Sequence, residues 1–514
     1  MFRVILLSLA TLITAFLLRA IPWAVHTFPL TNAEAVLFTV FSQVGGTATF
    51  VIESLKDEVL ESGLALFGIV TLAELVAAGI IMQVRTAAGS PAQKQRTYDR
   101  FFAICVRVQI VAFCALAIYG VVSFYRSGIP FAKYAKFIAG ELQKPSDSEL
   151  YRKHYAFPDS VQIKFPERKR NLIVILMESM ESNFQDKAHG GDLQKSGIPE
   201  FSKLAERNLS FTPGGVSVAG TGWTIAALVA KTCGVPLNIP LKRNAGDIAT
   251  FLPGAKCLTD ILKGEGYMTR FLEGSYGEFS STREFLQAHG HPELHDVPYY
   301  KGKGLLPKKY FVFWGMEDHK LYGFAKRELG DTAFTGKPFA MFISTIDTHE
   351  PYGYRCDICP KGPREKKKQY PTVLRCASHQ LNDFLAWAKT QPWYANTTIA
   401  VMGDHTVDGL SPAAGIPDGA ELRWVDLFVN SVQTTQNTRR EFSSFDMFPT
   451  LLESMGVQVE GRALGLGVSL FSGKPTLLDV YPQKELDSLL RQKSFQYNYF
   501  LYGDSAKARL MNLF

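Results

Sequence analysis

Four residues whose side chains can bind a divalent metal stand at the ends of apolar runs. Glu178 and the pair Asp404-His405 each follow a short run that is typical of a buried strand, and Thr224 stands before a run that is typical of a helix. The runs themselves are Leu172–Met177, Thr398–Met402 and Ile225–Ala230. Taken one at a time, a carboxylate at a strand end, a threonine cap and an Asp-His turn are ordinary structural features. Together they predict a four-ligand site for a borderline divalent ion.

Such a site would make Thr224 a nucleophile. An unassisted threonine hydroxyl is a poor nucleophile, and a bound metal would stabilise it as the alkoxide. The metal would also neutralise charge on a phosphoryl oxygen, and the N–H groups of a first helical turn suit the same anion. These residues therefore predict metal-assisted transfer of a phosphoryl group through Thr224.

The elements that position these residues follow an α/β pattern from Asn171 onward. Short apolar runs alternate with helical ones, which predicts a mostly parallel sheet covered on both faces, with ligands bound beyond the carboxyl ends of its strands. The predicted strands are Asn171–Met177, Tyr267–Leu272, Phe339–Ile346, Thr397–Met402 and Leu427–Val429. The predicted helices are Pro199–Asn208, Trp223–Thr232, Leu258–Gly264, Thr282–His289, Asp318–Leu329, Val373–Ala388 and Phe445–Met455.

The first 125 residues are far more apolar and predict transmembrane helices. Stretches of about twenty mainly apolar residues match the ~30 Å hydrocarbon thickness of a bilayer. There are four of them, Val4–Val25, Ala33–Ile52, Leu64–Met82 and Phe101–Phe124. The first is alternatively a signal peptide, although no small-x-small cleavage site follows it. Four spans place the N-terminus outside the cytoplasm and three place it inside.

Charge predicts the orientation of these spans. The loop before the fourth stretch is basic and favours the cytoplasmic side, whereas the loop before the third is acidic. The basic residues are Arg85, Lys94, Arg96 and Arg100, and the acidic ones are Asp57, Glu58 and Glu61. Everything after the fourth span is then expected outside the cytoplasm.

Cysteine usage agrees with an oxidising compartment. Cys233 and Cys257 are a plausible disulfide, and Cys376 has two candidate partners, Cys356 and Cys359. A zinc site around Cys356-x-x-Cys359 is the alternative, but a fourth ligand is not evident nearby in the sequence.

The predicted organisation has four parts: transmembrane helices over 1–125, an interfacial helix and linker over 126–170, a catalytic domain over 171–476 and a C-terminal tail over 477–514. Ser127–Leu142 sets apolar residues against lysines, which is typical of a helix in the membrane interface or of one packed on the soluble domain. The net charge of +7 is spread over 514 residues without a basic stripe, so we expect no nucleic-acid partner.

The same residues carry a resemblance to a known family. Four segments look like the sulfatase-fold lipoteichoic acid synthase group, and the Thr224 segment is most similar to the phosphoglycerol transferases of osmoregulated periplasmic glucans. The segments are Asn171–Ser179, Gly220–Leu237, Thr345–Pro351 and Gly403–His405. The resemblance covers roughly residues 171–472 and implies a fold of the sulfatase and alkaline phosphatase type. Ordinary sulfatases match poorly because they need C/S-x-P-x-R, whereas Ile-Ala-Ala-Leu follows Thr224.

The resemblance also implies roles for individual residues. Glu178, Thr224, Asp404 and His405 match the metal ligands of the group, which binds manganese or zinc, and Thr224 matches its nucleophile. His349 matches a histidine that contacts the phosphoryl or leaving group. Arg283 is a candidate for binding the substrate headgroup, although this chain has Ser280 and Thr282 where the lipoteichoic acid synthase pattern has a Trp and an Arg.

The implied enzyme is a multi-pass protein of the bacterial inner membrane with its catalytic domain in the periplasm. It would move phosphoglycerol from phosphatidylglycerol, a membrane lipid, to a periplasmic glucan through a covalent intermediate on Thr224. Two alternatives within the same chemistry are a phosphoethanolamine transferase acting on lipid A or a glycan, and polyglycerolphosphate synthesis of the lipoteichoic acid type. An alternative from another class is a membrane sensor or scaffold that has lost catalysis.

Overall fold

The described residues of the chain form two compact units, one N-terminal up to residue 134 and one from residue 135 onward. The computed structural model describes residues 2–27, 55–69, 143–238, 251–278, 281–310, 312–330, 336–350, 352–363, 365, 368–406, 414–417 and 419–503, with scattered positions elsewhere between 34 and 140.

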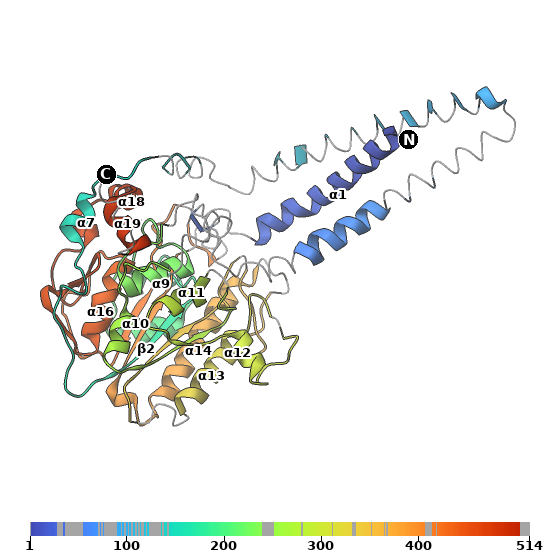
Figure 1. Ribbon diagram of the computed structural model, residues 1–514. Coiled ribbons are helices and arrows are strands. Elements are labelled where there is room, and N and C mark those ends of the chain that lie inside the picture. Colours follow the sequence, from blue (N-terminus) through green and yellow to red (C-terminus); the bar gives the residue numbers. More distant parts are fainter. Residues whose placement is uncertain are drawn as a thin grey trace. The chain divides into compact units, whose positions relative to one another are not determined.

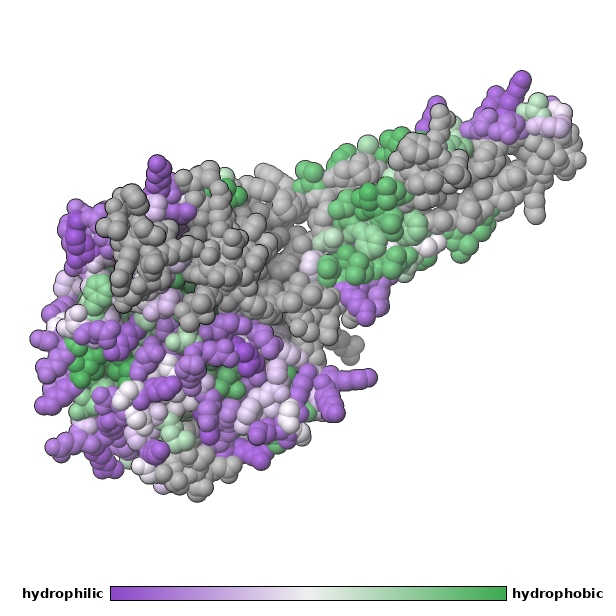
Figure 2. Space-filling view, viewed as in Figure 1, coloured by the Kyte–Doolittle hydropathy of each residue, from purple (hydrophilic) through white to green (hydrophobic). Residues whose placement is uncertain are grey.

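Helices with exposed apolar side chains make up what is described of the N-terminal unit. α1 (Phe2–Thr27) contacts a π-helical turn, Leu55–Glu61. Large apolar side chains are exposed here, among them Leu9, Ile13, Leu17, Leu64 and Ile69, and they give this unit the green surface in Figure 2. Within the described residues, none of the helices combines the length and the apolar character that a membrane crossing requires. Most of the second, third and fourth predicted spans lies outside the described residues.

A mostly parallel sheet organises the second unit, as predicted, and it has six strands. The strand order is β4-β3-β5-β2-β6-β7, and all neighbours run parallel except β6 and β7. The strands are β2 (Asn171–Met177), β3 (Met268–Glu273), β4 (Glu293–His295), β5 (Phe339–Ser344), β6 (Thr397–Gly403) and β7 (Asp426–Val429). The carboxyl ends of five parallel strands therefore meet at one edge, which is where a ligand site is expected.

The helices cover both faces of this sheet (Figure 1). They are α8 (Pro199–Arg207), α9 (Thr224–Cys233), α10 (Leu258–Gly264), α11 (Thr282–Ala288), α12 (Val297–Gly302), α13 (Asp318–Gly330), α14 (Tyr370–Ala388) and α16 (Met447–Ser454). All seven residues of β2 are buried, because a central parallel strand packs against helices on both sides. Ile173 and Ile175 belong to one apolar cluster with residues of α8, α13 and α14. Alternate β2 residues point to the other face, and α9 contacts α10 and α16 outside that cluster.

Several regions differ from the sequence predictions, among them α12, which was not predicted as a helix. The edge strand β4 was not predicted, because Glu293-Leu-His295 is too short and polar to give a strand pattern. The segment after residue 476 was predicted as a tail, but it folds into α17 (Leu477–Val480), α18 (Gln483–Arg491) and α19 (Phe495–Tyr502). Leu486 and Leu490, one turn apart on α18, are buried. Amphipathic spacing over only nine residues is a weak signal in the sequence, but it is sufficient once a neighbouring surface exists.

These C-terminal helices pack beside the loop that leads to Thr224. The Ala219 N–H donates to Asp487 Oδ1 at 2.7 Å, and the Asn238 N–H donates to Tyr497 Oη at 2.7 Å. The predicted linker is ordered as well from residue 143, with α7 (Glu149–His154) and a short strand that pairs with residues 458–459. Both segments therefore belong to the packed unit.

Candidate active site

Glu178 stands one residue beyond the buried strand β2 and is held there by its backbone. Its N–H donates to Thr345 Oγ1 at 3.0 Å, and the Thr348 hydroxyl donates to its carbonyl oxygen. Ser179 follows in the left-handed region with φ 50°, so the chain turns sharply at this point. The Glu178 side chain is only 2% exposed, which places a carboxylate inside the protein at the ligand-binding edge of the sheet.

Asp404 and His405 reach the same place because β6 pairs with β2. The register sets Met177 opposite Gly403, so β2 and β6 end at the same level of the sheet. The Asp404 N–H donates to the Met177 carbonyl at 3.1 Å, and the Ser179 N–H donates to Asp404 Oδ1 at 2.8 Å. A residue with a side chain would not fit at 403, because its Cβ would lie 2.1 Å from the Met180 carbonyl oxygen. Gly403 therefore allows the two strand ends to approach closely.

The three polar side chains converge on one point. His405 Nε2 lies 3.4 Å from Asp404 Oδ2 and 3.7 Å from Glu178 Oε1, and one ligand atom from each residue lies within 4.8 Å of the others. His405 Nδ1 lies 3.1 Å from the Thr406 carbonyl, which can only accept a hydrogen bond. That contact assigns the proton of the neutral ring to Nδ1 and leaves the Nε2 lone pair directed at the two carboxylates.

Thr224 completes this arrangement from the start of α9. Its Oγ1 donates to Glu178 Oε2 at 3.4 Å. Apart from Thr224 itself, which is half-buried, every residue of α9 is buried, and the helix ends at Gly234 in the left-handed conformation. The N–H groups of a first helical turn have no partner within the helix, so the hydroxyl stands beside donors suited to a phosphate.

The charges at this point favour a bound cation. Burial, followed by repulsion from Asp404, raises the pKa of Glu178 to about 8, although His405 and Ser179 act in the opposite direction. Two carboxylates and an imidazole lone pair that face one another repel unless a proton or a metal lies between them. Two carboxylate oxygens, one imidazole nitrogen and one hydroxyl are ligands that suit zinc or manganese. The residues present therefore fit the metal that the sequence predicts.

A buried lysine behind the site was not predicted from the sequence. Lys231 is 1% exposed and lies seven residues after Thr224, on the same face of α9. Its Nζ lies 3.6 Å from the centre of the Trp424 ring and donates to Ser444 Oγ at 3.0 Å. Burial lowers the pKa of Lys231 to about 7, and attraction to Asp404 partly offsets this. The one signal in the sequence is a lysine inside the apolar run that follows Thr224.

His349 lies on the loop that also holds Glu178. Thr348, directly before it, bonds to the Glu178 carbonyl, and the His349 ring packs against Trp314 with centroids 4.6 Å apart. His349 Nδ1 lies 2.8 Å from the Glu350 carbonyl oxygen and is therefore the protonated nitrogen of the neutral ring. Nε2 is then the nitrogen able to accept a proton. The role of His349 toward a substrate remains a prediction.

Arg283 has partners within the protein. Its Nη2 lies 2.7 Å from Asp296 Oδ2 and 3.7 Å from Glu278 Oε1. Asp296 is buried and also accepts a hydrogen bond from the Gly277 N–H, so the guanidinium compensates a buried charge in this loop. These contacts explain Arg283 structurally, and headgroup binding by it remains a prediction.

The structure contains two disulfides among its described residues. Cys233, at the end of α9, joins Cys257, which precedes α10, and this is the pair that the sequence favoured. Cys376 pairs with Cys359 rather than with Cys356, the other candidate partner. The first bridge fixes the far end of the helix that carries Thr224.

Comparison with known proteins identifies the family. The sequence pattern of the sulfatase family matches residues 170–457, which is more than half of the chain. The chain belongs to the sulfatase family. Within the family it is similar to phosphoglycerol transferase I of Xanthomonas campestris pv. campestris, with 31% identity over 325 residues, covering 60% of this chain and 43% of that protein. Its identity to phosphoglycerol transferase I of Escherichia fergusonii is 32% over 244 residues, covering 47% and 31% of the two chains.

This sulfatase-family chain spans less than half the length of those relatives. Among solved structures it is similar to the lipoteichoic acid synthase LtaP from Listeria monocytogenes, with 16% identity, a TM-score of 0.47 and coverage of 60% of this chain and 79% of that one. By sequence, the chain is thus a member of the sulfatase family that is similar to the phosphoglycerol transferases.

Proposed function

We propose that this enzyme transfers phosphoglycerol from phosphatidylglycerol to a glycan and carries the group on Thr224 between the two steps. The observation that supports this most directly is the contact of Thr224 Oγ1 with Glu178 Oε2 at 3.4 Å, beside the buried Asp404 and His405. A hydroxyl that faces a metal-type ligand set at a helix start is suited to attack a phosphodiester. Similarity to the phosphoglycerol transferases supports the choice of group.

One manganese or zinc ion would be held by Glu178, Asp404, His405 and Thr224. When bound, it lowers the pKa of the threonine hydroxyl and offsets charge on the phosphoryl oxygens. The Glu178, Asp404 and His405 side chains are nearly fully buried, so electrostatic interactions at this point act through little water. The N–H groups at the start of α9 bind the non-bridging phosphate oxygens.

The reaction takes place in two displacements. Thr224 gives its hydroxyl proton to solvent before the first displacement and reacts, and later leaves, as the oxygen anion. In the first displacement, Thr224 Oγ1 forms a bond to phosphorus, the bond from phosphorus to the diacylglycerol oxygen breaks, and that oxygen takes up a proton. His349 supplies this proton from Nε2 after accepting one from solvent. In the second, an acceptor hydroxyl attacks the glycerophospho-threonine, its proton passes to His349, and Thr224 leaves.

We further propose that the enzyme is anchored in the bacterial inner membrane with its sulfatase-type domain in the periplasm. The exposed apolar side chains of the N-terminal unit support a lipid environment, and the two disulfides support an oxidising compartment. Alkaline phosphatase fused to the C-terminus should be active and green fluorescent protein dark. The reverse pattern would place the domain in the cytoplasm and exclude a periplasmic glucan.

Mass spectrometry of the covalent intermediate tests the chemistry. The full-length enzyme is incubated in detergent with manganese or zinc and with phosphatidylglycerol, then quenched in acid and digested. We expect a glycerophosphoryl group on the peptide that contains Thr224, its absence in Thr224→Ala, and slower formation in Thr224→Ser. Metal content should be measured in each variant, so that loss of the nucleophile is distinguished from loss of the metal.

The same experiment separates the rival functions. A phosphoethanolamine adduct formed only from phosphatidylethanolamine would replace the donor that we propose. An enzyme that forms no adduct from either lipid while it holds its metal would be a catalytically inactive scaffold. Near-wild-type turnover by Thr224→Ala would refute the nucleophile itself.

A further inference from the structure

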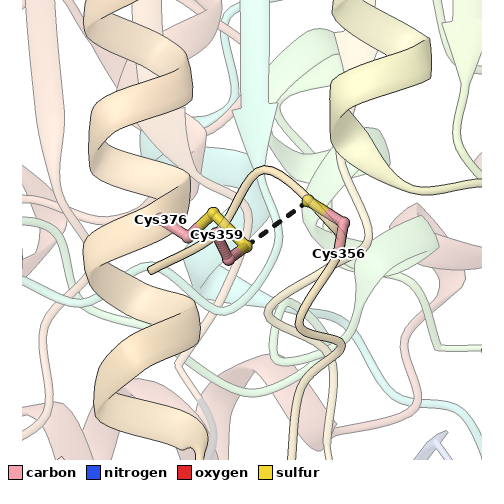
Figure 3. Close-up of side chains that lie close together, drawn as sticks. All are labelled: Cys356, Cys359 and Cys376. Atoms are coloured by element: carbon pink, nitrogen blue, oxygen red, sulfur yellow. Dashed lines mark hydrogen bonds between the residues drawn. A yellow bond between two sulfur atoms is a disulfide. The ribbon is translucent and has the colours of Figure 1, made fainter. Parts of the chain in front are cut away.

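A third cysteine lies against one of the two disulfides. Cys359 and Cys376 are bonded, and the free thiol of Cys356 lies 3.4 Å from Cys359 Sγ (Figure 3). Cys356 and Cys359 belong to a short loop whose tip is exposed to solvent, whereas Cys376 belongs to α14. A thiol in contact with a disulfide sulfur is placed for exchange, because its thiolate attacks that sulfur directly.

The side chain of Gln380 connects both ends of the cluster. Its Nε2 lies 3.4 Å from Cys376 Sγ and 3.9 Å from Cys356 Sγ, and the glutamine is buried one helical turn after Cys376. An amide N–H beside a sulfur stabilises the thiolate form of that sulfur. Gln380 can therefore stabilise either the attacking thiolate of Cys356 or the departing thiolate of Cys376.

We propose that these three cysteines form a thiol–disulfide exchange centre, in which the chain alternates between a Cys359–Cys376 and a Cys356–Cys359 bridge. Cys356 Sγ loses its proton and forms a bond to Cys359 Sγ. The bond between Cys359 Sγ and Cys376 Sγ breaks, and Cys376 leaves as a thiolate that takes up a proton. One disulfide is present before and after the step, so no external oxidant or reductant is required.

The surroundings of Cys356 make this exchange slow. Burial, followed by the nearby carboxylate of Asp347, raises the pKa of the Cys356 thiol to about 11, and Asp318 on α13 acts in the same direction. Tyr354, in the same loop, also lies close enough to interact with the thiol. Only about one thiol in 10,000 is then ionised at pH 7, and the fraction rises tenfold with each pH unit.

Exchange would free the loop from helix α14. The Cys359–Cys376 bridge ties the loop to α14, whereas a Cys356–Cys359 bridge lies within the loop. The same loop is joined to the segment that bears His349, because the Gly353 N–H donates to the His349 carbonyl at 2.9 Å and the Tyr354 N–H donates to the Asp347 carbonyl at 2.6 Å. The cluster therefore controls how firmly the residues after His349 are held, whichever reaction the enzyme catalyses.

Alkylation of the intact protein tests the exchange. The full-length enzyme, purified without reductant, is treated with iodoacetamide between pH 7.5 and 9.5 and mapped by mass spectrometry. We expect label on Cys356 and on Cys376, together with a peptide bridged between Cys356 and Cys359, and a rate for Cys376 that rises about tenfold per pH unit. Label on Cys356 alone at every pH, or a Cys356–Cys376 bridge, would overturn the proposal.

Two single-serine variants serve as a matched pair. Cys356→Ser retains the original bridge and should leave Cys376 unlabelled, whereas Cys376→Ser should contain the Cys356–Cys359 bridge. If Cys356 and Cys359 were both still free thiols in Cys376→Ser after exposure to oxidised glutathione, the proposal would be contradicted. Trypsin should cut after Lys361 several times faster in Cys376→Ser than in Cys356→Ser, and equal rates would show that the loop is not released. The Cys233–Cys257 bridge must remain unlabelled in both variants, which shows that the label reports exchange within the three-cysteine cluster and not general reduction.

Discussion

Proton release on metal binding is the sharpest test of the buried ligand set. In the metal-free enzyme the pKa of Glu178 is about 8, raised by burial and by Asp404. A divalent metal binds the carboxylate and not the carboxylic acid, so it must displace this proton at neutral pH. We therefore expect the affinity for manganese or zinc to increase with pH and one proton to be released from Glu178 for each metal bound.

The size of the effect follows from this pKa. At pH 7 a group with a pKa of about 8 is protonated in about 90% of molecules. The metal therefore binds about tenfold more weakly than at high pH, where Glu178 is ionised, which is a loss of about 1.4 kcal/mol of binding free energy. Each further pH unit below this weakens binding by about tenfold, and the dependence should flatten above pH 8. The metal affinity must rise with pH and not fall, because a raised carboxyl pKa means that protons compete with the metal up to a higher pH.

Titration calorimetry of the chelator-treated, full-length enzyme provides the measurement. Titrations at pH 7 in two buffers of different ionisation enthalpy count the protons released, and a pH series gives the slope. Glu178→Gln should bind metal weakly and release about one proton fewer than the wild type. An affinity independent of pH between 7 and 8, or equal proton release by Glu178→Gln and the wild type, would refute this account of the site.

A single hydroxyl near Glu178 allows a finer test without removing a ligand. The Ser179 hydroxyl donates to Glu178 Oε1 and favours its ionised form. Ser179→Ala should therefore raise the pKa of Glu178 further, by roughly one unit, and weaken metal binding at pH 7 by up to about tenfold. Ser378→Ala is the matched control, because Ser378 Oγ also donates to a glutamate, Glu200, at 2.9 Å, but lies on α14. Its metal affinity should equal that of the wild type.

Three further predictions concern stability. Burial raises the pKa of Asp426 to about 8, whereas the pKa of an unfolded aspartate is about 3.9. The wild type should therefore lose stability as pH rises from about 4 to about 8, with no further loss from this group above that. Relative to the wild type, Asp426→Asn should gain Tm progressively over the same range, measured by scanning calorimetry. Replacing Cys233 and Cys257 by serine opens a loop of 24 residues and should lower the free energy of unfolding by about 3.5 kcal/mol in urea titrations. Lys231→Met should stabilise the metal-free protein by a few kcal/mol at pH 7, because a buried charge is removed. The same variant should nevertheless transfer the group more slowly. A gain in stability with unchanged turnover would show that Lys231 has no part in the reaction.

The sequence was sufficient to predict that Glu178, Asp404 and His405 lie at one edge of the sheet. The aliphatic runs that form β2 and β6 end directly at Glu178 and Gly403, and parallel strands bring their carboxyl ends to one edge. The mostly parallel character of the sheet and the position of these side chains at its edge therefore follow from local patterns. Thr224 is found in the same way, because an apolar helical run begins at that residue.

Other features depend on contacts between residues that are far apart in the chain. Lys231 donates a hydrogen bond to Ser444, 213 residues away, and nothing in the run that contains the lysine indicates this partner. By contrast, the proton position on His405 depends on the carbonyl of the next residue, Thr406, whose direction in the folded chain the sequence does not give. The segment after residue 476 has too few apolar positions to predict its packing, because a short helix is stabilised by the surface it covers and not by its own sequence.

The cysteines show the same division most clearly. Five of the seven cysteines lie after the predicted spans, which predicts an oxidising compartment from the sequence alone. Which of Cys356 and Cys359 bonds Cys376 is a matter of a few ångströms between a loop and α14, and spacing along the chain does not determine it. Local patterns fix which chemistry the residues can perform, whereas the tertiary structure decides which side chains are close enough to perform it, because a bond or a hydrogen bond depends on distance in space and not on separation in sequence.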